Sequence, residues 1–124
     1  MIDHMTLRVR DYAKSKAFYA AALKPLGYTV LMEFGEFCGL GTGGKPDFWI
    51  APAEAGKHPP PMHFAFSAPD TKTVDAFHAA ALAAGAKDKG GPGPREQYHP
   101  SYYGAFALDP DAHNLEVVCH RAKK

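Results

Sequence analysis

The sequence predicts an α+β fold made of two βαβββ modules, because the chain repeats itself and each copy changes hydrophobic period in the same order. When the chain is shifted by 59 positions, His4 falls on His63 and Asp11 falls on Asp70. Eight of the twenty aligned positions from residue 4 to residue 23 are identical. A repeat of this kind indicates two copies of one supersecondary unit. We therefore expect a single domain of 124 residues, with module one at about 1–56 and module two at about 61–121.

Each copy begins with a strand and continues into a helix. Around both His4 and His63, apolar and polar residues alternate with the period of a half-buried strand. The alanine-rich runs 13–23 and 71–84 then predict helices, since alanine is the best helix former. Aspartates suited to N-capping precede both runs and glycines suited to ending a helix follow them: Asp11, Asp70, Gly27 and Gly85.

Three further strands follow each predicted helix. They span residues 28–34, 37–41 and 47–51 in the first copy, and about 86–89, 102–108 and 114–120 in the second. Pro59–Pro61 lies between the copies and predicts a stiff connector that keeps the two modules apart.

Strand parity places His4, His63 and Glu116 on one face of the sheet, opposite the apolar residues that should pack on the helices. Outward polar residues on a one-sided sheet are the simpler interpretation. However, two histidines at equivalent repeat positions with a carboxylate on the same face fit a metal site better. These three residues are the predicted metal ligands.

The chain resembles the vicinal-oxygen-chelate superfamily, which includes glyoxalase I, bleomycin-resistance proteins, fosfomycin-resistance thiol transferases and extradiol dioxygenases. The segments that carry the resemblance are IDHMTLRV, SKAFYAAALKPLGY, MHFAFSA and YYGAFALDPDAHNLEVVC. The resemblance implies an eight-stranded curved mixed sheet, an open cup with the helices outside, around one divalent metal held by His4, His63 and Glu116. It also implies a homodimer whose subunits exchange modules to complete each cup, although single-chain cups also occur in the superfamily.

One departure from glyoxalase I concerns the fourth ligand. In glyoxalase I a glutamate comes from the fourth strand, whereas here Trp49 stands at the repeat position equivalent to Glu116. Two histidines and one carboxylate leave open positions, which suits a metal that binds substrate or oxygen directly. The ion could be Fe, Mn, Ni, Co or Zn. Trp49 then either walls the substrate pocket or fills core between the modules.

A general base is also expected. Tyr103 shares the parity of Ala105 and Ala107, which brings it near the metal if that alternation points into the cup. His99 and Tyr98 in the preceding loop are the alternatives, and Tyr98 could instead extend the aromatic pocket wall. The loop 88–101 is long for a hairpin connection. Either it binds substrate, with Arg95 meeting an anionic group, or it is a solvated surface loop.

The composition limits which classes of binding partner and which cellular compartment we expect. A net charge of +1 provides no large field for nucleic acid or an acidic membrane surface. No apolar run approaches the roughly 20 residues that span a bilayer. Two cysteines without a disulfide framework, and a strand rather than a signal peptide at the N-terminus, predict a cytoplasmic protein.

The predicted function is a divalent-metal-dependent enzyme acting as a lyase, isomerase or dioxygenase. Its substrate is a small molecule that chelates the metal through vicinal oxygens. One alternative is a fosfomycin-type or glutathione-linked thiol transferase. A second alternative is a metal-free binding protein of the bleomycin-resistance type.

Overall fold

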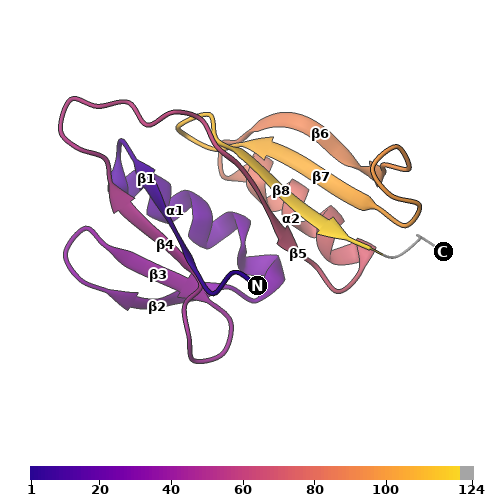
Figure 1. The fold of residues 1–124 in the computed structure, drawn as a ribbon, viewed down its shortest axis with the longest axis horizontal. Helices are drawn as coiled ribbons and strands as arrows, with labels where there is room; N and C mark the ends of the chain where they lie inside the picture. Colours follow the sequence, from indigo (N-terminus) through magenta and orange to yellow (C-terminus); the bar gives the residue numbers. More distant parts are fainter. Residues whose placement is uncertain (121–124) are drawn as a thin grey trace.

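The computed structural model describes residues 1–120 and has two βαβββ modules that follow one another along the chain (Figure 1). The first module contains β1 (Met5–Val9), α1 (Tyr12–Ala22), the 3₁₀ turn η1 (Lys24–Leu26), β2 (Thr29–Glu33), β3 (Cys38–Gly41) and β4 (Phe48–Pro52). The second contains β5 (His63–Ser67), α2 (Thr71–Ala83), β6 (Lys87–Pro94), β7 (Tyr103–Leu108) and β8 (Asn114–Cys119). The α+β class and the two modules are therefore confirmed. The expected end of module two, at about residue 121, lies outside the described residues.

The helix starts agree with the sequence. The Asp11 carboxylate accepts a hydrogen bond from the Lys14 backbone N–H at 3.1 Å, and the Asp70 carboxylate accepts one from the Thr73 N–H at 2.8 Å. Each bond satisfies one of the donors that a helix leaves unpaired in its first turn. The two equivalent aspartates thus cap the two equivalent helices.

The eight strands lie in two separate four-stranded sheets, with the orders β1-β4-β3-β2 and β5-β8-β7-β6. β1 runs parallel to β4 and β5 runs parallel to β8, while the other pairs are antiparallel. The expectation of one continuous eight-stranded sheet is therefore corrected, since no strand pairing within residues 1–120 joins the two sheets. β1 and β5 each end a sheet with a free edge. β6 is longer than predicted because its glycines and prolines still pair with β7 through two register shifts.

Both modules share one hydrophobic core. Tyr19 from α1 and Phe48 from β4 contact the ring of Phe64 on β5, with centroids 6.4 and 5.6 Å away, and Phe48 also contacts Phe66 at 5.2 Å. The helices α1 and α2 contact each other. The connector through Pro59–Pro61 therefore does not keep the modules apart, because burial of these rings outweighs any stiffness of the link. In Figure 1 the helices lie behind the two sheets.

The shared core determines where the opposite faces of the sheets point. The helix-side residues of β1, Leu7 and Val9, are fully buried. The other face of the two strands is exposed. Its residues are His4, just before β1, Thr6 and Arg8 on β1, and His63, Ala65 and Ser67 on β5. We call these two exposed faces the cup faces. In Figure 1 both sheets lie in front of the helices, so both cup faces lie on the side of the molecule away from the helix layer. No helix in residues 1–120 is long and apolar enough to cross a membrane.

Candidate functional site

The second module brings two of the predicted ligands together. Nε2 of His63 on β5 lies 3.0 Å from Oε1 of Glu116 on β8. β8 lies between β5 and β7, and the register places Glu116 beside Ala65 and Phe106. Flanked on both sides, the Glu116 side chain is only 2% exposed, whereas that of His63 is 53% exposed. The pair therefore consists of a buried carboxylate and an accessible imidazole.

Tyr102 is the site residue that the sequence did not single out. Its hydroxyl donates a hydrogen bond to Oε2 of Glu116, so both oxygens of this carboxylate have partners. Burial raises the pKa of Tyr102, and the bond to Glu116 raises it further. The phenol therefore keeps its proton at neutral pH and acts as a donor to Glu116.

Tyr103 lies on the other side of the sheet, which corrects the predicted parity of this strand. Its hydroxyl donates to Oδ1 of Asp75 on α2 at 2.7 Å, and the side chain is buried. The reason is the register of β7, in which Ala105 and Ala107 pair with Val117 and Leu115 on the helix side. Pairing β7 with β8 in the sequence would have placed Tyr102, not Tyr103, on the face of Glu116.

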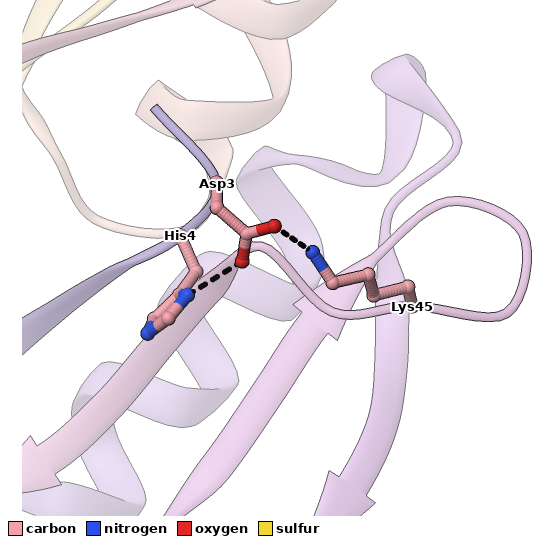
Figure 2. Close-up of polar contacts among 3 residues, drawn as sticks. All are labelled: Asp3, His4 and Lys45. Atoms are coloured by element: carbon pink, nitrogen blue, oxygen red, sulfur yellow. Dashed lines mark hydrogen bonds and ion pairs between the residues drawn. The ribbon is translucent and has the colours of Figure 1, made fainter. Parts of the chain in front are cut away.

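His4 belongs to a separate arrangement on the first module, shown in Figure 2. Its Nδ1 lies 2.7 Å from Oδ1 of Asp3, and the Lys45 ammonium pairs with Oδ2 of the same carboxylate. Figure 2 shows Asp3 between the other two side chains. The Lys45 and His4 contacts lower the pKa of Asp3, with the Lys45 hydrogen bond the largest cause. Asp3 is therefore a carboxylate that accepts from His4 Nδ1.

Trp49 shares the cup face of the first module with His4. Both line a hollow of about 420 Å³ together with Thr6, Phe37 and Lys45. The indole lies over Gly39, where an added Cβ would come within 2.9 Å of the ring, and its ring centroid is 5.0 Å from that of Phe37. The Trp49 ring therefore lines a hollow beside the predicted ligand His4, which is the position that a wall of the substrate pocket would have.

The two histidines present the same nitrogen for ligation. Nδ1 of His63 lies 3.2 Å from the backbone carbonyl oxygen of Asn114, just as Nδ1 of His4 faces Asp3. In a neutral imidazole, a ring nitrogen beside an oxygen acceptor holds the proton when the other nitrogen has no such partner, which is the arrangement at His4. Metal-binding histidines in proteins usually have such an acceptor behind them. Nε2 is therefore the nitrogen that would face an ion on both residues. At His63 this nitrogen lies 3.0 Å from Oε1 of Glu116, so an ion would take the place of the proton between them.

One chain does not complete the predicted triad. Within residues 1–120, no three His, Cys, Asp or Glu side chains lie close enough to hold one metal ion. The structure joins His63 with Glu116 and leaves His4 on the other sheet. Each module thus carries one part of the site, which we call the His4 half-site and the His63–Glu116 half-site.

The remaining predicted residues lie around the β6–β7 loop. The Tyr98 ring is 60% exposed and lies 5.1 Å from that of Tyr102. The His99 ring meets His120 edge-on at 5.7 Å. The Arg95 guanidinium donates to backbone carbonyls at the end of β6, at Gly91, Gly93 and Pro94, over 2.8, 3.0 and 3.3 Å. The side chain of Tyr98 contacts the ring of Tyr102, while Arg95 and His99 bond to the Tyr102 backbone over 2.7 and 3.0 Å.

Comparison with known proteins agrees with this architecture. Residues 1–117 match the model of the Glyoxalase/Bleomycin resistance protein/Dioxygenase superfamily. A glyoxalase/bleomycin resistance protein from Albidiferax ferrireducens T118 superposes with a TM-score of 0.79 at 27% identity, covering 94% of this chain and 96% of that one. A family enzyme from Burkholderia phytofirmans PsJN has the same fold, with a TM-score of 0.73 at 23% identity and coverage of 95% and 97%. No curated protein sequence matches the chain. The match over residues 1–117 shows that this chain belongs to the glyoxalase/bleomycin resistance protein/dioxygenase superfamily.

Proposed function

We propose that this protein is a divalent-metal-dependent enzyme of the glyoxalase or dioxygenase type. It acts as a lyase, isomerase or dioxygenase on a small substrate that chelates the metal through vicinal oxygens. The observation that supports this most is the common orientation of the two histidines. Both have Nδ1 against an oxygen acceptor and both present Nε2 on a cup face.

The donor set fits a divalent ion. Two ligands at right angles on an ion with bonds of roughly 2.0–2.2 Å lie about 3 Å apart. Nε2 of His63 and Oε1 of Glu116 are 3.0 Å apart, so they suit neighbouring positions on one ion. His4 would be the third ligand. Imidazole with carboxylate accepts Fe, Mn, Ni, Co or Zn, and three protein ligands leave positions for substrate.

The third ligand would come from a second copy of the chain. Because the two cup faces of one chain turn away from the shared core, the His4 half-site of one protomer would meet the His63–Glu116 half-site of its partner. A twofold dimer would make two such sites, and this is the commonest closed assembly. Met32 and Phe34 on and beside β2 are exposed apolar side chains that such a contact would cover.

When bound, the ion would stabilise negative charge that develops on a chelated substrate oxygen. The chain's own residues have separate tasks. Tyr102 keeps a proton next to Glu116 and can donate it to a neighbouring oxygen. Asp3 orients His4, and Trp49 with Phe37 forms a flat apolar wall that suits a planar or partly aromatic substrate.

Metal analysis of the purified protein tests the ligands. We expect about one divalent ion per chain in the wild type and little in His63→Ala, with the fold retained. His58→Ala is the matched control, since His58 is an exposed linker histidine whose Nδ1 contacts only its neighbour's carbonyl among the described bonds. Full occupancy in His63→Ala would refute the assignment.

Subunit mixing tests the shared site. Neither His4→Ala nor Glu116→Ala homodimers should hold metal. A mixed dimer of the two should contain one intact and one doubly defective site, and so recover about half a metal ion per chain. A monomer in light scattering, or no recovery after confirmed exchange, would exclude sharing.

A second function has one observation in its favour. Both Glu116 oxygens already have partners within the chain, which a metal-free binding protein of the bleomycin-resistance type could use as a permanent arrangement. In that case the wild type would contain no metal at any stage of purification, and added Zn²⁺ would not bind.

A further inference from the structure

Arg95 is the charged side chain that the proposed function leaves unused. Its three carbonyl bonds hold the guanidinium against the end of β6, and its Cζ lies 5.5 Å from the centroid of the Phe106 ring. This distance is within the range of a cation–π contact. Its donors are directed at backbone oxygens, so the end of β6 and not a substrate receives them.

The space for this guanidinium is created by glycines. Gly90 on β6 pairs with Phe106 on β7. A Cβ at Gly90 would lie 3.1 Å from Phe106 Cδ1 and 3.2 Å from Arg95 Nη2, and one at Gly93 would lie 3.2 Å from Arg95 Nη1. All three distances are shorter than ordinary van der Waals contacts. The glycine-rich run of β6 thus allows Arg95 to lie over Phe106.

Phe106 in turn contacts the proposed ligand. Its ring stacks on the imidazole of His63 with centroids 6.2 Å apart and planes inclined by 23°. The register also places Phe106 beside Glu116, so it borders both members of the half-site. Arg95, Phe106 and His63 therefore form a continuous column that crosses from the β6–β7 loop to β5.

We propose that Arg95 is a positioning residue that holds the His63 imidazole in its ligating orientation through Phe106. The inference rests on the proposed function, in which His63 is a metal ligand. The His63 ring is half exposed on an edge strand. The Asn114 carbonyl and Oε1 of Glu116 contact its two nitrogens, and the column contacts the face of the ring. A planar guanidinium can both stack and donate in several directions, which a lysine ammonium cannot do. The same residue therefore fastens the loop and supports the ring.

Arg95→Gln removes the charge and the planar fork, and Arg95→Lys keeps the charge alone. Lys89→Gln is the control, because it removes one positive charge from the same strand at an exposed position. Phe106→Leu removes the ring, and Phe106→Tyr restores it. Two measurements apply to each variant: the His63 ring resonances in metal-free protein, and the affinity for Zn²⁺.

We expect Arg95→Gln, Arg95→Lys and Phe106→Leu to shift the His63 ring resonances and to weaken Zn²⁺ binding by roughly tenfold or more, as losses behind a ligand usually do. Lys89→Gln and Phe106→Tyr should match the wild type. If Arg95→Gln does not fold, the Phe106→Leu and Phe106→Tyr pair carries the test. Unchanged resonances and affinity in the folded Arg95 variants would overturn the proposal. If the wild type binds no Zn²⁺, the proposed function fails, and the resonances alone then decide whether Arg95 orients the ring.

Discussion

The hydroxyl of Tyr102 donates to one oxygen of Glu116, while the other oxygen lies 3.0 Å from Nε2 of His63. A carboxylate that is 2% exposed is thereby satisfied on both sides without any ion. Tyr102 comes from the end of the β6–β7 loop, whereas Glu116 and His63 come from paired strands. The relationship therefore joins the loop to the half-site, and it can be tested by substitution.

Tyr102→Phe should destabilise the metal-free protein by about 1–3 kcal/mol, because it leaves a buried oxygen of Glu116 without its donor. Urea denaturation measures this loss. Tyr98→Phe is the control, since the Tyr98 ring is exposed and touches Tyr102 only by its edge. Equal stability of the two variants would contradict the bond.

Gly104→Ala should disturb the same contact from the backbone side. An added Cβ would lie 3.1 Å from Tyr102 Cε1 and 3.3 Å from Glu116 Oε2. The Tyr102 ring can swing outward more easily than the central strands can separate, so its bond to Glu116 should be lost. Gly91→Ala has open space at Cβ and serves as the control. In a double-mutant cycle with Tyr102→Phe, the two losses should fall well short of additive; full additivity would mean that Gly104 acts elsewhere.

Asp3→Ala should release the His4 imidazole from its single tautomer and weaken Zn²⁺ binding by roughly tenfold. Asp3→Asn keeps an oxygen that accepts from Nδ1, so it should retain most of the affinity. Nitrogen-15 spectra of the two rings measure the tautomers directly. His63 is an internal reference, because its Nδ1 faces a backbone carbonyl that neither substitution touches. A His4 tautomer that does not respond to Asp3→Ala would disprove this role.

Asp109 should make stability depend on pH. Burial raises the pKa of its carboxyl above the ordinary value, although the Tyr19 and His113 bonds oppose the shift. A raised folded pKa means that the group's contribution is complete below the unfolded pKa and is lost as pH rises through the folded one. Asp109→Asn keeps an oxygen for the Asp111 and His113 N–H groups, so it should fold. Unfolding free energies measured from about pH 4 upward should fall less steeply in the variant; parallel profiles would rule out the shift.

Trp49 should report on ligands of the first cup face. It is the only tryptophan of the chain, so its fluorescence has one source. Catechols added to metal-loaded protein should quench it more strongly than 2-oxoacids of similar affinity, because the indole forms a flat wall with Phe37. Metal-free protein should respond weakly. An equal response with and without metal would mean that the ligands bind away from the ion.

The modules and the helix caps could be predicted because they depend on short-range patterns. The repeat of His4 and Asp11 at His63 and Asp70 specifies two copies of one unit, and each aspartate caps its own helix. Sheet closure depends instead on long-range packing. Nothing in the periodicity of β5 indicates that Phe64 would contact Tyr19 and Phe48, and these contacts join the two modules through one core.

The candidate site likewise combines features that short-range patterns predict with features that depend on long-range packing. Glu116 and His63 could be paired from parity, since parallel strands in register bring them to one face. The predicted orientation of Tyr103 was wrong because the alternation within β7 does not say which side of the strand faces the helix. Only the pairing of β7 with β8 decides it. Arg95 contacts carbonyls at the end of β6 because glycines leave room for it, which side-chain types alone do not reveal.

The hydrophobic core that joins the modules also couples movements of the two cup faces. Because Phe64 packs on Tyr19 and Phe48, a tilt of one half-site would press on the rings that support the other. In a twofold dimer, a protomer that shifts to admit substrate at one site would therefore shift at the second site as well. The two sites of the proposed dimer would then be a linked pair, in which occupancy of one would alter the affinity of the other.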